Sequence, residues 1–210
     1  MSTGNQVARL TIGTPRRLTT VPVLILHAYG LLLFVPVLAA ILVASSLGTL
    51  SLVALVAVAG FAVATFFLPI GFGNPYVKRL VREYLPTQAG ESDRFVVQVT
   101  LNPRLHSGLR GLVEDADDFG YLWFTESELV FRGDAINATI PFAQIREVQR
   151  LGIRLRGLFL CKRRIAVVVP GLEQVESLEF AERSSSVLPG SRAAARKLYE
   201  RLCAAAGKPG

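Results

Sequence analysis

The chain carries no Asp, Glu, Lys or Arg between Val21 and Ile70, and this run constrains the possible folds more than any other feature. It divides into two apolar segments, 21–44 and 50–70, separated by the small polar stretch SSLGT. Each segment is long enough to cross a hydrocarbon core of ~30 Å, which needs about 20 helical residues. Two spans joined by so short a loop predict an antiparallel membrane hairpin. The alternatives are a buried helix pair and, for the first segment, a cleaved signal peptide.

The charges that flank the run predict its orientation. Three arginines precede the first segment, and Lys78, Arg79 and Arg82 follow the second, whereas the connecting stretch is uncharged. Positive residues stay on the cytoplasmic side of a membrane, so both termini are expected in the cytoplasm. The predicted localisation is the inner (cytoplasmic) membrane of a bacterium, as a multi-pass protein. Cys161 and Cys203 are then expected to be reduced thiols.

The remaining chain is expected to divide into four parts around this hairpin. Residues 1–20 form a cytoplasmic tail, 71–93 a juxtamembrane linker with a short basic helix, 94–206 a cytosolic domain, and 207–210 a short tail. The composition supports this division, because charged residues return only after the apolar run and then continue to the C-terminus.

Short segments of alternating apolar and polar residues fill the domain at 94–206. In FVVQVTL, Phe95, Val97, Val99 and Leu101 share one face, which is typical of a half-buried strand. Further segments of this kind are YLWFT, ELVFR, NATIP, IREVQ, RIAVVVP and ESLEFAE. About seven short strands predict an antiparallel sandwich or small barrel. The amphipathic stretch SRAAARKLYERLCAAAG then predicts one helix that covers an open end of the barrel.

The middle of this domain resembles a known family. GYLWFTESELVFRGD followed by IPFAQIREV is similar to the strand–turn–strand core of PH-like and GRAM-like domains, with the apolar-Thr pair at Phe124-Thr125 and the Ile-Pro-aromatic step at 140–142. The resemblance extends over roughly 95–206. A two-helix hairpin ahead of such a domain resembles the bacterial membrane-anchored PH-like proteins.

The resemblance implies a fold class of two parts. These are a membrane α-helical hairpin and an α+β or all-β PH-like barrel, of about seven antiparallel strands capped by a C-terminal helix. No eukaryotic phosphoinositide site is carried over, because the region 102–119 is longer than a simple hairpin requires.

The segment RLGIRLRGLFLCKRR, residues 150–164, holds six basic side chains and no acidic one. Its first half alternates, so a strand there has an apolar inner face and a basic outer face. Beside an anionic cytoplasmic leaflet, such a face is expected to contact lipid headgroups; a solvated strand face is the alternative. The candidate lipid-surface residues are Arg150, Arg154, Arg156, Lys162, Arg163 and Arg164.

Several chemistries are not expected. Residues 91–210 are only about +2 in net charge (17 basic minus 15 acidic), which argues against nucleic-acid binding. DADDFGYLWFTE at 115–126 has the spacing of a calcium loop, but Phe119 stands where an oxygen ligand is needed, so no metal site is predicted. No phosphate loop, zinc-ligand cluster or catalytic motif appears, so neither a cofactor nor a catalytic residue is predicted.

The predicted function is the display of a binding or scaffolding domain near the inner leaflet, for interaction with a lipid surface or with a protein partner. The alternatives are an accessory subunit of a membrane transport or secretion complex, in which the hairpin is the functional part, and an enzyme with an unrecognised site.

Overall fold

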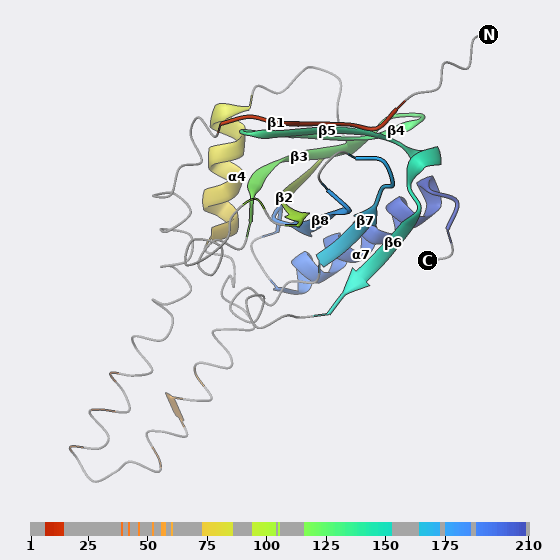
Figure 1. Ribbon diagram of the computed structural model, residues 1–210. Coiled ribbons are helices and arrows are strands. Elements are labelled where there is room, and N and C mark those ends of the chain that lie inside the picture. The colour runs from red at the N-terminus through yellow and green to blue at the C-terminus, as the bar shows by residue number, and fades with distance from the viewer. Residues whose placement is uncertain are drawn as a thin grey trace.

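The structure is a computed structural model, and one antiparallel sheet of eight strands dominates it (Figure 1). The structure describes residues 7–14, 73–85, 94–103, 105, 116–152, 164–172, 175–185 and 188–208, together with seven scattered positions between 39 and 60. The strands are β1 (Arg9–Ile12), β2 (Phe95–Asn102), β3 (Asp118–Phe124), β4 (Glu128–Gly133), β5 (Ile136–Pro141), β6 (Glu147–Leu151), β7 (Arg164–Val168) and β8 (Ser177–Glu182). The helices are α4 (Gly73–Tyr84), α7 (Leu188–Ala205) and the short 3-10 helix η1 (Phe142–Gln144).

Two antiparallel meanders make up most of the sheet. Strands β2 to β5 form the first and β6 to β8 the second, and pairing of β2 with β8 joins them, with Val99 opposite Phe180. Strand β1 extends the first meander by pairing with β5, so that Arg9 lies opposite Thr139. The complete order is β1-β5-β4-β3-β2-β8-β7-β6.

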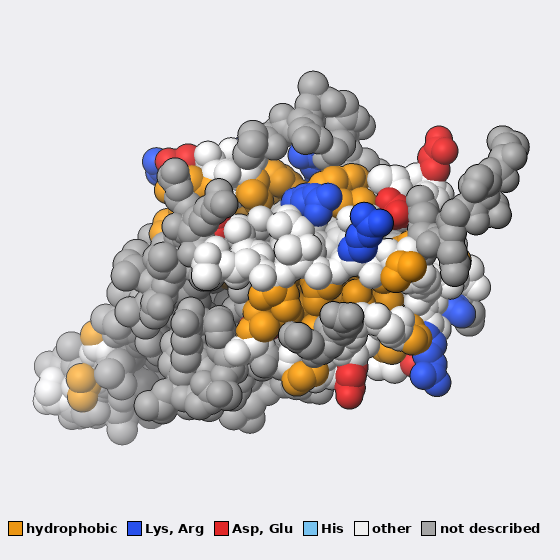
Figure 2. Space-filling view, turned by 45° about the horizontal axis from the view of Figure 1, so that its top comes forward, with side chains coloured by type: hydrophobic (Ala, Val, Ile, Leu, Met, Phe, Trp, Pro, Cys, Tyr) orange, Lys and Arg blue, Asp and Glu red, His pale blue; other side chains and the backbone are white. Residues whose placement is uncertain are grey.

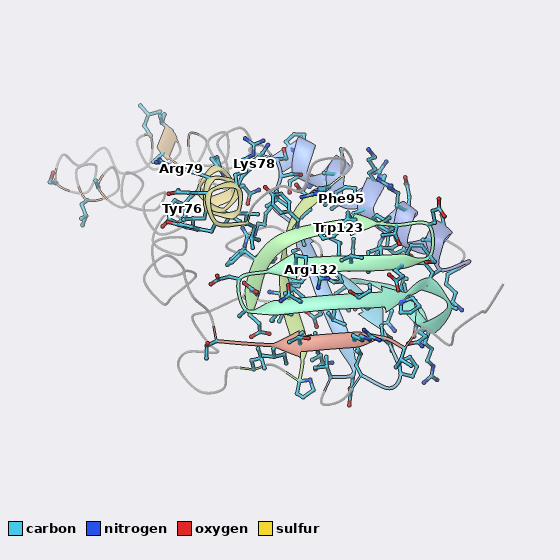
Figure 3. All side chains as sticks on the ribbon, turned by 90° about the horizontal axis from the view of Figure 1, so that it is seen from above. Tyr76, Lys78, Arg79, Phe95, Trp123 and Arg132 are labelled. Atoms are coloured by element: carbon cyan, nitrogen blue, oxygen red, sulfur yellow. The ribbon has the colours of Figure 1, made fainter. Side chains whose placement is uncertain are left out.

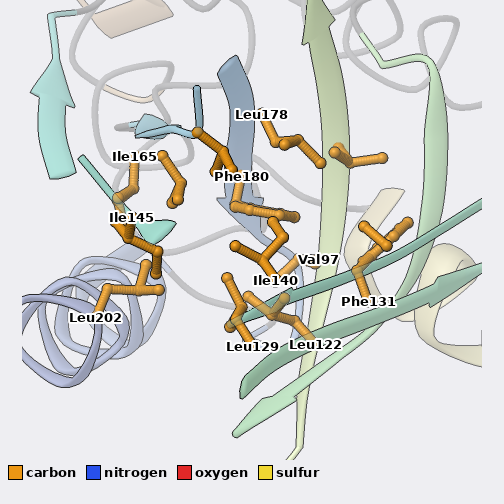
Figure 4. Packing of buried hydrophobic residues seen from close by; sticks show 14 of the residues in the cluster. Val97, Leu122, Leu129, Phe131, Ile140, Ile145, Ile165, Leu178, Phe180 and Leu202 are labelled. Atoms are coloured by element: carbon orange, nitrogen blue, oxygen red, sulfur yellow. The ribbon is translucent and has the colours of Figure 1, made fainter. Parts of the chain in front are cut away.

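The main core lies between the curled sheet and α7 (Figure 4). Phe131 of β4 and Phe180 of β8 pack with ring centroids 5.9 Å apart. Leu198 and Leu202 close the core from α7, one helical turn apart and fully buried. Burying one such side chain contributes roughly 1.5–3 kcal/mol, so the apolar stripe of α7 explains why this helix docks on the sheet.

A second, smaller core lies on the opposite face of the sheet, under α4. Val77 and Val81 of α4 are buried against Phe119 and Tyr121 of β3. Figure 3 shows α4 end-on beside the curved strands that carry Phe95 and Trp123. The sheet is therefore covered on both faces where β2 and β3 run.

A buried polar network holds α4 in this place. Arg183, which is 1% exposed, donates from Nε to Oε1 of Gln98 (2.8 Å) and from Nη1 to Oδ1 of Asn74 (3.2 Å). Seven of the eight residues of β2 are buried. The prediction of a half-buried strand at 95–101 is thus correct for the strand and wrong for its burial, because α4 covers the face that carries Gln98 and Thr100.

The predicted fold class is wrong, because the strands of the domain at 94–206 do not close into a PH-like barrel. All seven segments predicted as strands are strands, but they belong to an open, curled sheet that resembles half a barrel, and β1 and β6 end it without pairing with each other. The additional strand β1 lies in the stretch that was assigned to the cytoplasmic tail 1–20. Its pairing with β5 lengthens the sheet at one edge, so the observed count in the described chain is eight.

The predicted membrane hairpin, and with it the multi-pass inner-membrane localisation, is also corrected. Among the described residues, no helix is long and apolar enough to cross a membrane. Helix α4 has 12 residues and carries Lys78, Arg79 and Arg82, and α7, with 18, carries several charged side chains. The segments 21–44 and 50–70 lie outside the described residues apart from the seven scattered positions.

Candidate anion-binding site

Four arginines from three elements line one small cavity of about 270 Å³ at the β6 edge of the sheet. We call this cavity the arginine pocket. Its lining residues are Arg150 of β6, Arg164 and Ile165 of β7, and Arg192, Ala195, Arg196 and Tyr199 of α7.

Strand register and helical spacing bring these residues together. In the β6–β7 pair, Arg150 lies opposite Ile165 and Leu151 opposite Arg164, so both arginines sit at the same end of the pair. The three polar residues of α7 follow one another at intervals of four and three positions, which places them on one face of the helix. Because α7 packs against both β6 and β8, this face meets Arg150, which shares the core face of the sheet with Ile165. The side chain of Arg164, in contrast, points to the other face together with Glu179.

Arg164 is held in place by a buried carboxylate. Its Nη1 lies 3.1 Å from Oε2 of Glu179 on the neighbouring strand β8, and both side chains are less than a tenth exposed. Removing one partner of such a pair typically costs 3–5 kcal/mol, because the other charge stays buried without compensation. The ion pair therefore fixes the orientation of Arg164.

Arg150 is fixed by an aromatic ring. Its guanidinium carbon lies 3.9 Å from the ring centroid of Tyr199, in a cation–π contact. A hydrogen bond with the buried Cys203 and burial raise the pKa of Tyr199 above its usual value, and the nearby Arg150 acts in the opposite direction. Tyr199 is therefore a neutral phenol near pH 7 and adds no negative charge to the pocket.

Arg192 and Arg196 make no ion pair in the described part of the chain, and the acidic side chain nearest to them along α7 is Glu200, one turn after Arg196. Both are exposed and stand one helical turn apart. In the described part of the chain, neither makes an ion pair or a side-chain hydrogen bond, and the first turn of α7 has no acidic residue. Like charges at this spacing destabilise a helix by roughly 0.2–0.5 kcal/mol. The Arg164–Glu179 ion pair is neutral and lies on the other face of the sheet, so the charges on the α7 side of the pocket are those of Arg150, Arg192 and Arg196, a net +3.

Two of the six candidate lipid-surface residues, Arg150 and Arg164, line this pocket. The other four candidates, Arg154, Arg156, Lys162 and Arg163, lie outside the described residues, as does Cys161. Arg192 and Arg196 are not among the predicted site residues, because helical periodicity alone places them only on the outer face of the C-terminal helix. Their signal was the spacing of two arginines and a tyrosine along one side of that helix.

A second, larger cavity of about 820 Å³ lies toward the other edge of the sheet. It is lined by β1, the β4–β5 turn and the end of α4, and it contains Glu83 and Asp134 but no Lys or Arg among its described lining residues. We call it the acidic cavity. On the face shown in Figure 2, basic and acidic side chains are scattered beside exposed apolar ones.

Asp118 stabilises the β4–β5 turn that forms one wall of the acidic cavity. Its Oδ2 accepts hydrogen bonds from the backbone N–H groups of Ala135 and Ile136, both at 2.7 Å, and its Oδ1 accepts one from Phe119. Burial raises the pKa of Asp118 to about 6, although these hydrogen bonds lower it in part. The carboxylate is thus used by the backbone and is not available to a ligand.

Comparison with protein-family models and with curated proteins finds no match for this chain. Within the described residues, no three His, Cys, Asp or Glu side chains form a group that could hold a metal ion. Among the described residues, the arginine pocket brings together three arginines without an ion pair, so it is the candidate functional site.

Proposed function

We propose that this chain is a binding module and that the arginine pocket holds an anionic group of its ligand. One observation carries the proposal: Arg150, Arg192 and Arg196 line a cavity of about 270 Å³ and make no ion pair in the described part of the chain. Guanidinium groups bind phosphate and carboxylate oxygens through two parallel hydrogen bonds, which makes arginine the preferred residue for recognising these anions.

The chemistry of the lining residues supports binding rather than catalysis. The pocket offers guanidinium groups, a neutral phenol and the apolar side chains of Ile165 and Ala195. A guanidinium stays protonated in proteins, and a phenol with a raised pKa stays protonated near neutral pH, so neither group acts as a general base there. The lipid-surface and protein partners predicted from the sequence both present phosphate or carboxylate groups, which suits this pocket.

Isothermal titration of the purified full-length chain with inorganic phosphate at low salt tests the proposal. We expect binding in the millimolar range or tighter, weakening as salt rises. The double variant Arg192→Gln/Arg196→Gln should lose it. The matched control is Arg132→Gln/Arg146→Gln, which removes two exposed arginines that do not line the pocket. No phosphate binding, or an equal loss in both double variants, would contradict the proposal.

A further inference from the structure

We infer that the preferred ligand of the arginine pocket is a dianionic phosphate monoester, and not a phosphate diester or a carboxylate. This inference rests on the proposed function, because it names the chemical class of the anion that the same pocket binds. Three features support it: the number of arginines without an ion pair, the different elements that carry these arginines, and the size of the cavity.

The charge of the pocket exceeds what a single negative charge balances. Glu179 neutralises one of the four arginines, and Arg150, Arg192 and Arg196 have no acidic partner among the described residues. The attraction between ligand and pocket scales with the product of their charges, and it strengthens where water is partly excluded. A dianion therefore gains more than a monoanion, and it reduces more of the repulsion among the arginines.

The arginines approach the cavity from separate elements. Arg150 belongs to β6, and Arg192 and Arg196 belong to α7. The guanidinium of Arg164, in contrast, is paired with Glu179 on the other face of the sheet. A phosphate monoester presents three terminal oxygens that accept strong hydrogen bonds, and these can serve several guanidinium groups at once. A diester has only two free oxygens and a carboxylate has two, so either leaves more of the donors without an acceptor.

The cavity also limits the size of what enters it. About 270 Å³ is near the lower end of small-molecule sites, which run from about 300 to 1,000 Å³. It accommodates a phosphate and the first atoms of the group that carries it, against Ile165 and Ala195, rather than a complete nucleotide. We infer that the rest of the ligand stays outside the pocket.

Protonation of the ligand offers a distinguishing signature. A phosphate monoester gains its second charge at a pKa of about 6, whereas a diester has no such step. The charged or titratable groups that line or adjoin the pocket are Arg150, Arg164, Glu179, Arg192, Arg196, Tyr199, Glu200 and Cys203. Monoester binding should therefore strengthen between about pH 5 and pH 7.5, and the diester reports any change due to the protein itself.

The test is isothermal titration of the full-length chain with methyl phosphate, dimethyl phosphate and acetate at low salt. We expect methyl phosphate to bind about tenfold more tightly than dimethyl phosphate near pH 7.5, which corresponds to one unit in log Kd, and this ratio to shrink near pH 5. Arg192→Gln/Arg196→Gln should reduce the ratio, and Arg132→Gln/Arg146→Gln should leave it unchanged.

Equal affinity for the two esters, together with measurable binding of both, would overturn this inference and leave the proposed function intact. If no anion binds, both fail. A further arm finds the source of the phosphate by sedimenting the chain with vesicles of phosphatidic acid or phosphatidylglycerol in neutral lipid. Binding to phosphatidic acid alone, displaced by methyl phosphate, supports a lipid headgroup. Binding of methyl phosphate without either vesicle supports a soluble ligand, and equal binding to both vesicles contradicts the monoester.

Discussion

The arginine pocket and the acidic cavity lie toward opposite edges of one sheet. They differ in whether their charged groups have partners within the protein. At the acidic cavity, the buried carboxylate of Asp118 accepts three backbone hydrogen bonds and holds a turn in place. In the arginine pocket, Arg192 and Arg196 approach one another with no acidic partner in the described chain. The hydrogen bonds of Asp118 end on the protein backbone and hold a turn, although burial disfavours its charged form, whereas the uncompensated arginine charges destabilise the fold slightly and are available to a ligand.

The largest expected effect on the free energy of unfolding lies at Arg164, the pocket residue that is paired with a buried carboxylate. Arg164→Met leaves the carboxylate of Glu179 buried without its partner, and we expect it to lower the free energy of unfolding by about 3–5 kcal/mol. Chemical denaturation measures this. The double variant Arg164→Met/Glu179→Gln should recover most of the loss, and a single-variant loss below about 1 kcal/mol would place Arg164 with the uncompensated charges.

The pH dependence of the free energy of unfolding should reveal the ionisation of Asp118, which holds the turn beside the acidic cavity. The pKa of Asp118 is raised from 3.8 to about 6 in the folded protein, so the folded state binds more protons than the unfolded state between these values. Protonated Asp118 contributes up to about 3 kcal/mol to the free energy of unfolding. This contribution is present in full below about pH 4 and is lost as the pH rises through 6. The measurement is denaturation across this range, compared with Asp118→Asn, in which that part of the slope should disappear. An unchanged slope in the variant would show that another group causes it.

A smaller effect is expected at the contact between Arg150 and Tyr199. Arg150→Leu removes a cation–π interaction at an exposed site, which contributes about 0.5–1 kcal/mol. Since Arg150 lowers the pKa of Tyr199, the variant should also raise that pKa, which ultraviolet titration against Tyr199→Phe detects. A fall in this pKa would show that Arg150 does not act on the phenol.

The smallest effect has the opposite sign. Arg192→Gln/Arg196→Gln removes a like-charge pair one helical turn apart, so we expect a gain of about 0.2–0.5 kcal/mol in the free energy of unfolding. The same variant should lose anion binding, as proposed above. Stability is measured by denaturation beside Arg132→Gln/Arg146→Gln. If the pocket variant is instead destabilised, the two arginines contribute to the fold and the contrast between the cavities weakens.

Local sequence patterns were informative where consecutive residues determine structure. The alternation in YLWFT and ELVFR marks strands β3 and β4, and the apolar spacing after Ser191 marks α7. The same reasoning was wrong about the membrane hairpin, since none of the helices in the described part of the chain is long and apolar enough to cross a membrane. It also missed β1, since four residues near the N-terminus form a strand only beside β5.

The sequence by itself determined the strand segments, the amphipathic C-terminal helix and the basic character of the stretch that contains Arg150 and Arg164. Only the tertiary structure decided that α4 buries the second face of β2, and that Arg192 and Arg196 join those two arginines in one cavity. The physical reason is that periodicity is a property of neighbouring residues, while the meeting of side chains some 40 positions apart depends on strand register and on where a helix docks.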